Sequence, residues 1–315
     1  EICGPKFDPM RVLIVGLGVQ GEKRKSICGD DFVASVDPIN PQADFKNLGD
    51  VPLDNYDAVL ACTPDSPKRR IIEYCLNHSK HVLVEKPLWA ENPQIITELE
   101  SIAKSVGVVC YTAYNHRFEP HLVRLRRLIE SGELGRLYSC RLFYGNGTAD
   151  LVRNYRWRDM GGGVLSDLGP HLLDLSDFLF GNLTEGDWKL VSANYFENNS
   201  PDHGVIELKT NSFRIECEMT FLMWRNHFTC DIIAEYGSAH IESLCKWGPS
   251  KFIHRERVFP SGRPTEKETT LIQNDPTWSI EYEYFKELIR KNITTDLSKD
   301  RRILEVLNSL ERALI

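Results

Sequence analysis

The sequence lacks any long apolar run, any run of basic residues and any closely spaced pair of cysteines. No stretch approaches the roughly 18 consecutive apolar residues that a membrane-spanning helix needs, so we expect no membrane partner. The formal net charge of -7, without a basic run, argues against nucleic acid as a partner. Internal repeats and low-complexity segments are also missing. These absences leave an ordinary globular protein of 315 residues, long enough for about two domains.

The nine cysteines form no CxxC pair, and Cys62, Cys75 and Cys110 lie inside apolar segments. This pattern is typical of reduced thiols that pack as small hydrophobic side chains, so we predict a cytoplasmic protein. Because the spacing of a metal site is missing too, we expect no bound metal. The first nine residues, EICGPKFDP, lack the layout of a secretion signal, and we expect them to be an unstructured leader.

Short apolar runs alternate with amphipathic segments from Met10 to about Tyr114. The runs RVLIVGLG, FVASVD, AVLAC, HVLVEKP and VVCYTAY are typical of strands, and segments with helical spacing separate them. Their continuous hydrophobicity indicates strands that are buried on both faces of a parallel sheet. The sequence therefore predicts an α/β fold that starts with a doubly wound parallel sheet of Rossmann type over residues 10–114.

The pattern changes after residue 115. An amphipathic helix, PHLVRLRRLIES, ends near a glycine, and a glycine-rich loop then leads into another helix. Four later runs, LVSANYFEN, GVIELKT, FRIECEMTFL and FTCDIIAEYG, alternate polar and apolar residues. We therefore expect residues 115–315 to form an α+β domain with an open, mostly antiparallel sheet. Two helices end the chain, and packing of these helices on the first domain stays open.

The run VGLGVQG places Gly16, Gly18 and Gly21 in a G-x-G-x-x-G spacing, directly after a strand and before a helical segment. Such glycines allow a tight turn, a close approach of the backbone to a pyrophosphate and close helix–sheet contact. Asp37 follows Gly16 by 21 residues (37 − 16), close to the ~20 expected for the acid that binds an adenosine ribose. A carboxylate there repels a 2′-phosphate, so we favour NAD over NADP. A packing device without a ligand is the alternative.

Two further strand ends are expected near the cofactor, because ligands of open α/β sheets bind at the carboxyl ends of the strands. Thr63 and Pro64 follow the strand AVLAC, and Lys86 follows the next strand, in VLVEKP. Alone, Lys86 is typical of a solvated loop residue, but this position favours a cation at the cofactor edge. The predicted cofactor residues are Gly16, Gly18, Val19, Gln20, Gly21, Asp37, Thr63, Pro64, Glu85, Lys86 and Asn115.

Asp167 and His171 occur together in GGGVLSDLGPHLLDL. If the segment is one helix, their spacing of four residues puts both on one face. A carboxylate beside an imidazole fixes its tautomer, and a histidine can accept a proton near neutral pH. A capped helix start with a satisfied core histidine explains the pair equally well.

The motifs VGLGVQG, VLVEKP, YNHRF and GGGVLSDLGPHLLD resemble, in order and spacing, those of the glucose-fructose oxidoreductase, inositol dehydrogenase and MocA-like family. The resemblance spans about residues 10–180 and implies that Lys86, Asp167 and His171 are catalytic. It also implies that residues 115–315 form a domain for substrate binding and oligomerisation. The expected assembly is a homo-oligomer, a dimer or a tetramer, because the open sheet of this family often forms the oligomer contacts.

The chain departs from the family pattern after the strand AVLAC, where Asp65 and Lys68 replace the usual asparagine and histidine. The resemblance implies substrate contacts in YNHRF. Arg153, Arg156 and Arg158 offer a grip on a phosphate or carboxylate, although surface ion pairs are the slightly favoured interpretation. The predicted substrate residues are Lys86, Asn115, Arg117, Arg156, Asp167 and His171.

We predict an NAD-dependent oxidoreductase that acts on a carbinol carbon of a sugar, a sugar derivative or a nucleotide-linked sugar. In this hypothesis His171 takes the hydroxyl proton, and Lys86 stabilises the charge that develops on oxygen. Asp167 orients His171 or binds a neighbouring hydroxyl. Two alternatives stay open, since one fold hosts several functions. One is a lyase or glycosidase that retains its NAD, and the other is a non-catalytic sensor of cofactor or sugar.

Overall fold

The chain divides into two compact units in the computed structural model. The structure describes residues 10–155, 158–181 and 186–314. The first unit consists of Glu1–Tyr114 and Trp278–Leu304, and the second of Asn115–Thr277 and Glu305–Ile315. The expected nine-residue leader lies outside the described residues. The assignment of cofactor binding to residues 10–114 and of substrate binding to residues 115–315 stays a prediction.

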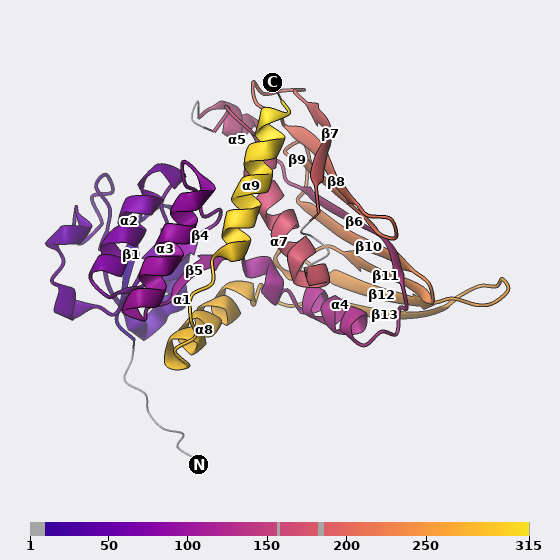
Figure 1. The fold of residues 1–315 in the computed structure, drawn as a ribbon, viewed down its shortest axis with the longest axis horizontal. Coiled ribbons are helices and arrows are strands. Elements are labelled where there is room, and N and C mark those ends of the chain that lie inside the picture. Colours follow the sequence, from indigo (N-terminus) through magenta and orange to yellow (C-terminus); the bar gives the residue numbers. More distant parts are fainter. Residues whose placement is uncertain (1–9, 156–157, 182–185, 315) are drawn as a thin grey trace, which may run out of the picture. The chain divides into compact units, whose positions relative to one another are not determined.

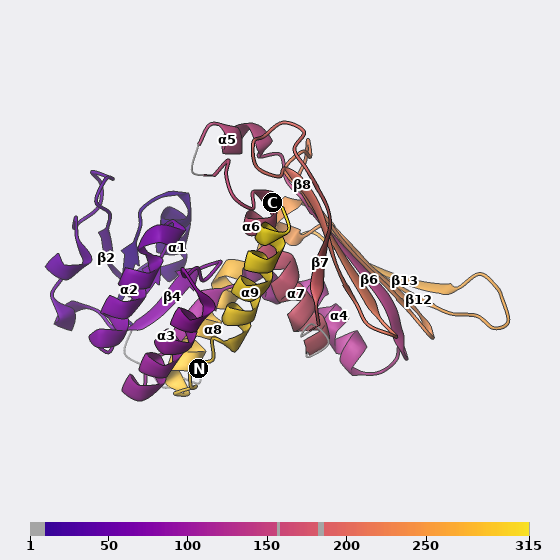
Figure 2. The same ribbon diagram turned by 45° about the horizontal axis from the view of Figure 1, so that its top comes forward.

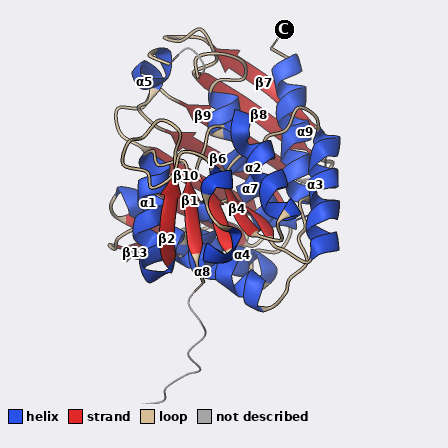
Figure 3. Cartoon of the chain, turned by 90° about the vertical axis from the view of Figure 1, so that its left-hand side faces the viewer, coloured by secondary structure: helices blue, strands red, loops and turns tan. Residues whose placement is uncertain are grey.

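The first unit is built on a five-stranded parallel sheet with the order β2-β1-β3-β4-β5, which confirms the predicted doubly wound sheet (Figure 1). Figure 3 shows these strands with helices packed around them. The strands are β1 (Val12–Val15), β2 (Phe32–Val36), β3 (Ala58–Ala61), β4 (His81–Glu85) and β5 (Cys110–Ala113). The helices are α1 (Val19–Cys28), α2 (Asp65–Asn77), α3 (Pro93–Val106) and α8 (Thr277–Arg290), together with the start of α9 (Ser298–Arg312).

Side chains are buried on both faces of this sheet, which explains why most positions of its strands are apolar. Leu13 and Val15 join a core that contains the inner faces of α2 and α3, whereas Val12 and Ile14 join a second core on the opposite face. Side chains of α8 complete that second core. Burial of one such side chain contributes about 1.5–3 kcal/mol, so both faces contribute to stability.

Local signals define α3 at both ends. The side chain of Asn92 accepts a hydrogen bond from the backbone N–H of Ile95, and Pro93 occupies the first turn. Gly107 ends the helix at a φ of +69°, a left-handed conformation that favours glycine.

The second unit is built on an eight-stranded sheet with the order β13-β12-β11-β10-β6-β9-β8-β7. Neighbouring strands are antiparallel except β6 and β9, which confirms a mostly antiparallel sheet. The strands are β6 (Leu137–Gly145), β7 (Trp188–Asn194), β8 (His203–Lys209), β9 (Arg214–Thr220), β10 (His227–Ala234), β11 (Gly237–Glu242), β12 (Ser250–Glu256) and β13 (Thr265–Leu271). The sequence reading did not anticipate β6, β11, β12 or β13.

One face of this sheet packs against helices of the second unit, and Figure 2 shows α4 and α7 along it. The helices of this unit are α4 (Pro120–Glu130), α5 (Ala149–Arg153), α6 (Val164–Asp167) and α7 (Gly169–Phe180), together with the end of α9. The opposite face carries ion pairs between neighbouring strands, such as Arg141 on β6 with Glu218 on β9 at 3.0 Å. The predicted homo-oligomer stays a prediction.

Within the described ranges, the structure contains no helix that is long and apolar enough to cross a membrane.

Candidate functional site

The glycine loop after β1 has three glycines with three different surroundings. A Cβ atom on Gly16 would lie 2.6 Å from the carbonyl oxygen of Cys62, and one on Gly21 would overlap the carbonyl oxygen of Gly16. A Cβ on Gly18 would meet no atom within 4 Å. Packing therefore requires glycine at positions 16 and 21, whereas at position 18 the absent side chain leaves open space at the start of α1.

That open space lies at a helix N-terminus. Gly18 is the residue before α1, and no side chain caps the helix there. Val19 is 85% exposed and Gln20 is exposed too. The first N–H groups of a helix and its dipole favour an anion, so this loop fits a pyrophosphate.

Asp37 follows β2 and is tied to the glycine loop. Its carboxylate accepts hydrogen bonds from the backbone N–H groups of Leu17 at 2.8 Å, Ile39 at 2.8 Å and Asn40 at 2.9 Å. Burial works to raise the pKa of Asp37, but these backbone donors outweigh it and hold the pKa below its ordinary value. The group is therefore a fixed negative charge at neutral pH, beside the loop that fits a pyrophosphate.

Thr63 and Pro64 follow β3, directly before α2. The hydroxyl oxygen of Thr63 is buried and has no hydrogen-bond partner within the described part of the chain. A buried hydroxyl group without a partner is costly. A bound molecule that exchanges a hydrogen bond with Thr63 would remove that cost.

Glu85, which was predicted to contact the cofactor, has a partner inside the protein. It accepts a hydrogen bond at 2.7 Å from Arg24 on α1, and the same guanidinium donates at 2.7 Å to Glu281 on α8. Arg24 is 1% exposed, and its guanidinium carbon lies over the ring of Trp278, 4.3 Å from the ring centroid. Burial works to lower the pKa of Arg24, but the two carboxylates raise it above its ordinary value, so the group stays charged. Glu85 thereby holds α1 and α8 against the end of β4.

Lys86 is the first residue after β4, and a second lysine, Lys68, contacts the backbone of the next residue. Lys68 is 1% exposed, and its ammonium donates to the carbonyl oxygen of Pro87 at 2.8 Å and to Asp65 at 2.7 Å. Burial lowers the pKa of Lys68, although the charge of Asp65 opposes this. The two residues that depart from the family pattern thus support the backbone next to Lys86.

Asp167 and His171 belong to two helices, so the condition of one continuous helix is not met. Helix α6 ends at Asp167 and α7 begins at Gly169, because the Gly169-Pro170 pair interrupts the backbone pattern. Asp167 accepts a hydrogen bond from Arg158 at 3.3 Å. His171 is 9% exposed in the first turn of α7.

His171 lies in an aromatic and basic cluster of the second unit, which we call the histidine cluster. Its ring stacks on that of His116, with centroids 4.3 Å apart and planes inclined by 26°. Lys246 lies 2.9 Å from Nε2 of His116 and 3.4 Å from the hydroxyl of Tyr144. Trp247 completes the cluster, 5.5 Å from Tyr144 between ring centroids. Burial, and then the charge of Asp167, raise the pKa of Tyr144, so its phenol stays protonated at neutral pH.

Sequence reasoning missed Tyr144, Lys246 and Trp247. These residues come from β6 and from the short turn Cys245–Trp247, which no motif marks. His116 stands inside the YNHRF motif and His171 inside GGGVLSDLGPHLLD, so these two motifs are the sequence signals that point to the cluster.

Asn115 and Arg117, which are also predicted to contact the substrate, have partners within the second unit. The amide of Asn115 donates to the hydroxyl of Thr277 at 2.8 Å. The guanidinium of Arg117 pairs with Asp174, which is 1% exposed, through Nε at 2.9 and 2.8 Å from the two carboxylate oxygens. These contacts give both residues a structural role, and their contact with substrate stays a prediction.

The structure describes two of the three arginines that precede the glycine-rich loop, Arg153 and Arg158. Arg153 pairs with Asp150 at 2.6 Å, and Arg158 pairs with Asp167. Both fit the ion-pair interpretation of these arginines. Arg156 lies outside the described residues.

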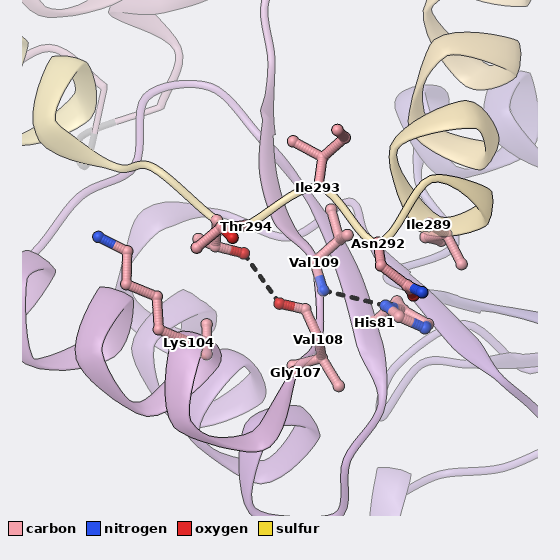
Figure 4. A pocket seen from close by; sticks show the side chains of 11 residues that line it. His81, Lys104, Gly107, Val108, Val109, Ile289, Asn292, Ile293 and Thr294 are labelled. Atoms are coloured by element: carbon pink, nitrogen blue, oxygen red, sulfur yellow. Dashed lines mark hydrogen bonds between the residues drawn. The ribbon is translucent and has the colours of Figure 1, made fainter.

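A pocket of about 330 Å³ lies at the amino-terminal ends of strands β4 and β5, away from the glycine loop and Lys86, which follow the carboxyl ends of their strands (Figure 4). Its lining includes His81 at the start of β4, residues 107–109 before β5 and residues 292–295 after α8. Nδ1 of His81 accepts a hydrogen bond from the backbone N–H of Val109 at 3.0 Å. No predicted site residue lines this pocket, and the amino ends of parallel strands are not where such sheets bind cofactors. Across the described residues, no group of three or more His, Cys, Asp or Glu could hold a metal ion.

Comparison with known proteins identifies the family of both units. Residues 30–114 match the model described as "Oxidoreductase family, NAD-binding Rossmann fold", and residues 122–240 match the GFO/IDH/MocA C-terminal domain. A trans-1,2-dihydrobenzene-1,2-diol dehydrogenase of Macaca fascicularis is 24% identical over 278 residues, which are 82% of this chain and 78% of the relative. The uncharacterized oxidoreductase YdgJ of Escherichia coli (strain K12) is 34% identical over 130 residues, which are 40% of this chain and 37% of YdgJ.

Solved structures share the whole fold. A levoglucosan dehydrogenase in complex with NADH has a TM-score of 0.81 at 17% identity, over 96% of each chain. The match to YdgJ covers well under half of that relative, whereas the two family models, taken together, cover most of both units. The chain belongs to the GFO/IDH/MocA oxidoreductase family.

Proposed function

We propose that this chain is an NAD-dependent dehydrogenase that oxidises a carbinol carbon of a sugar, a sugar derivative or a nucleotide-linked sugar. The observation that carries the proposal is the difference between the three glycines of the loop after β1. Packing accounts for Gly16 and Gly21, but Gly18 faces open space at the start of α1, and a pyrophosphate explains its lack of a side chain. The relatives support an alcohol as substrate, because one is named for a diol and another for an anhydrosugar.

Residues of the first unit would hold the cofactor. The N–H groups at the start of α1 bind the pyrophosphate, and the ionised carboxylate of Asp37 binds the ribose hydroxyls and disfavours a 2′-phosphate. The surface that the cofactor contacts would also include Val19, Gln20, Thr63 and Pro64. NAD, when bound, supplies the acceptor for the hydride.

Three side chains would carry the chemistry at the substrate. His171 accepts the proton of the hydroxyl group that is oxidised. Lys86 donates a hydrogen bond to the oxygen of that group and stabilises the negative charge that develops there. Asp167 orients the imidazole or binds a neighbouring hydroxyl, and the buried surroundings of His171 keep water away from it.

NADH formation tests the proposal directly. We expect the full chain with NAD to accumulate NADH with at least one member of a panel of free, phosphorylated and nucleotide-linked sugars, followed by NADH absorbance. A lyase or glycosidase that retains its NAD would convert a substrate without accumulating NADH, which product analysis of the same mixtures detects. Binding of NAD or sugar without any conversion would favour a sensor. Either of these last two results contradicts the dehydrogenase.

Two glycine substitutions separate cofactor binding from folding. Gly18→Ala is expected to keep the melting temperature of the wild type, because its Cβ meets no atom. The methyl group would keep the pyrophosphate from the backbone, so NAD affinity should fall about tenfold or more, equivalent to about 1.4 kcal/mol. Gly21→Ala is expected to lower the melting temperature itself, because its Cβ overlaps the carbonyl oxygen of Gly16.

Calorimetric titration with NAD and thermal unfolding of both variants measure these effects. Wild-type NAD affinity in a folded Gly18→Ala variant would remove the evidence that this loop binds a pyrophosphate.

A further inference from the structure

Lys246 belongs to the histidine cluster, but the proposed function gives it no role. Its ammonium lies 2.9 Å from Nε2 of His116, and the ring of His116 stacks on that of the predicted base His171. All three residues belong to the second unit. The ring of His116 thus connects the side chain of Lys246 to His171, which is proposed to accept the substrate proton.

The chemistry of this contact fixes the state of His116. A lysine ammonium has three donors and no acceptor, so Nε2 of His116 must offer its lone pair. An imidazole with a free lone pair on Nε2 is neutral and carries its proton on Nδ1. Contact with Lys246 therefore selects one tautomer of His116 and disfavours its protonated form.

Hydrogen bonds at both ends hold the backbone of the turn that carries Lys246. Glu119, which is 1% exposed, accepts a hydrogen bond from the backbone N–H of Cys245 at 3.1 Å. Arg225 donates to the carbonyl oxygen of Trp247 at 3.1 Å. Lys246 also lies over the ring of Trp247, 4.4 Å from its centroid. The backbone of the turn is thus held at both ends, while the ammonium of Lys246 contacts His116, Tyr144 and Trp247, which is the arrangement expected of a residue that positions another.

Because the rings of His116 and His171 are stacked, the orientation of His116 affects that of His171. The rings of His116 and His171 are nearly parallel, and the ring of Tyr144 lies 5.4 Å from one centroid and 5.7 Å from the other. A neutral ring on the face of His171 is compatible with a positive charge on His171 after proton transfer, whereas a charged ring would repel it. Rotation of His116 would also disturb the plane of the His171 ring.

We infer that Lys246 is a positioning residue, which holds His116 in its neutral Nδ1–H tautomer and thereby sets the ring of His171 for proton transfer. The part that concerns His171 rests on the proposed function. The state of His116 does not, and it can be measured without turnover.

Nitrogen-15 spectra of the imidazole groups test the tautomer in the full chain labelled with ¹⁵N-histidine. The His116 signals are assigned by their loss in His116→Gln. In the wild type we expect an unprotonated Nε2 and a protonated Nδ1 on His116. Lys246→Met should convert His116 to the other tautomer or to a mixture, whereas Lys246→Arg should keep it, because arginine also only donates. Lys251→Met, an exposed ion-pair residue of β12, should leave the His116 signals unchanged.

Kinetics test the consequence for His171. Lys246→Met should lower kcat about 10- to 100-fold, the scale of a misplaced catalytic group, with KM within about twofold. Lys246→Arg should recover most of the loss, and Lys251→Met should show none.

A protonated Nε2 on His116 in the wild type, or an unchanged kcat in Lys246→Met, would overturn the inference. If Lys246→Met does not fold, the spectra of the wild type and of Lys246→Arg still decide. If no substrate yields NADH, the proposed function fails, while the His116 spectra still decide the role of Lys246.

Discussion

Replacing His171 with alanine should lower turnover by about 10²-fold or more, the scale of one acid–base group. Lys86→Met should cause a loss of similar size, because the charge on the substrate oxygen then loses its hydrogen-bond donor. NAD affinity should stay nearly unchanged in both variants, since the glycine loop and Asp37 remain. The initial rate of NADH formation gives turnover, and calorimetric titration gives NAD affinity.

His254→Ala is the matched control for His171→Ala. Both histidines are 9% exposed and both lie in the second unit, but His254 belongs to β12 and not to the histidine cluster. A loss of turnover that merely reflects a cavity in the core would appear in both variants. Turnover at the wild-type level in both His171→Ala and Lys86→Met would contradict the catalytic assignment.

Replacing Arg24 with methionine should destabilise the protein by about 3–5 kcal/mol, the cost of leaving buried charges without their partner. Arg24 is 1% exposed, and its guanidinium lies between Glu85 and Glu281, which are 14% and 0% exposed. Methionine fills much of the same volume, so the lost charge and not a cavity dominates the effect. Urea unfolding of the purified variant, followed by tryptophan fluorescence, measures the free energy of unfolding.

Arg11→Met provides the comparison for Arg24→Met. Arg11 forms an ion pair with Asp57 at 2.7 Å, but both side chains are at least 40% exposed, so water replaces the partner when it is lost. We expect a much smaller change in unfolding free energy than for Arg24. Equal losses in the two variants would contradict a special role for the buried Arg24 bridge.

The parallel sheet was predictable because its central strands are buried on both faces. Runs such as RVLIVG and HVLVE show no regular polar alternation; glycine ends the first run, and proline stands two residues after the second. The strands of the second unit have one face that carries charge, so their signal is weaker. In β13 the residues TEKETTL are mostly exposed and polar, and nothing local marks them as a strand. Pairing with β12 decides their structure, and pairing is a property of the whole sheet.

The candidate site divides in the same way. Gly16, Gly18, Gly21 and Asp37 have a fixed spacing because one βαβ unit contains them all, so their sequence alone identifies them. The histidine cluster unites residues that are far apart in the chain, from His116 to Trp247, and only the folded sheet brings them together. Even the helix break between Asp167 and His171 depends on a Gly-Pro pair whose effect the spacing alone does not determine.

The return of α8 to the first unit has a consequence for the order in which the chain can fold during its synthesis. When the ribosome has made residue 114, all five strands of the parallel sheet exist, but Glu281, Tyr282 and Phe285 do not. Arg24 then has only one of its two carboxylates, and one face of the sheet lacks part of its core. The unit whose translation begins first is therefore completed only after residues Asn115–Thr277 of the second unit have been made, so a nascent chain must protect this apolar face until then.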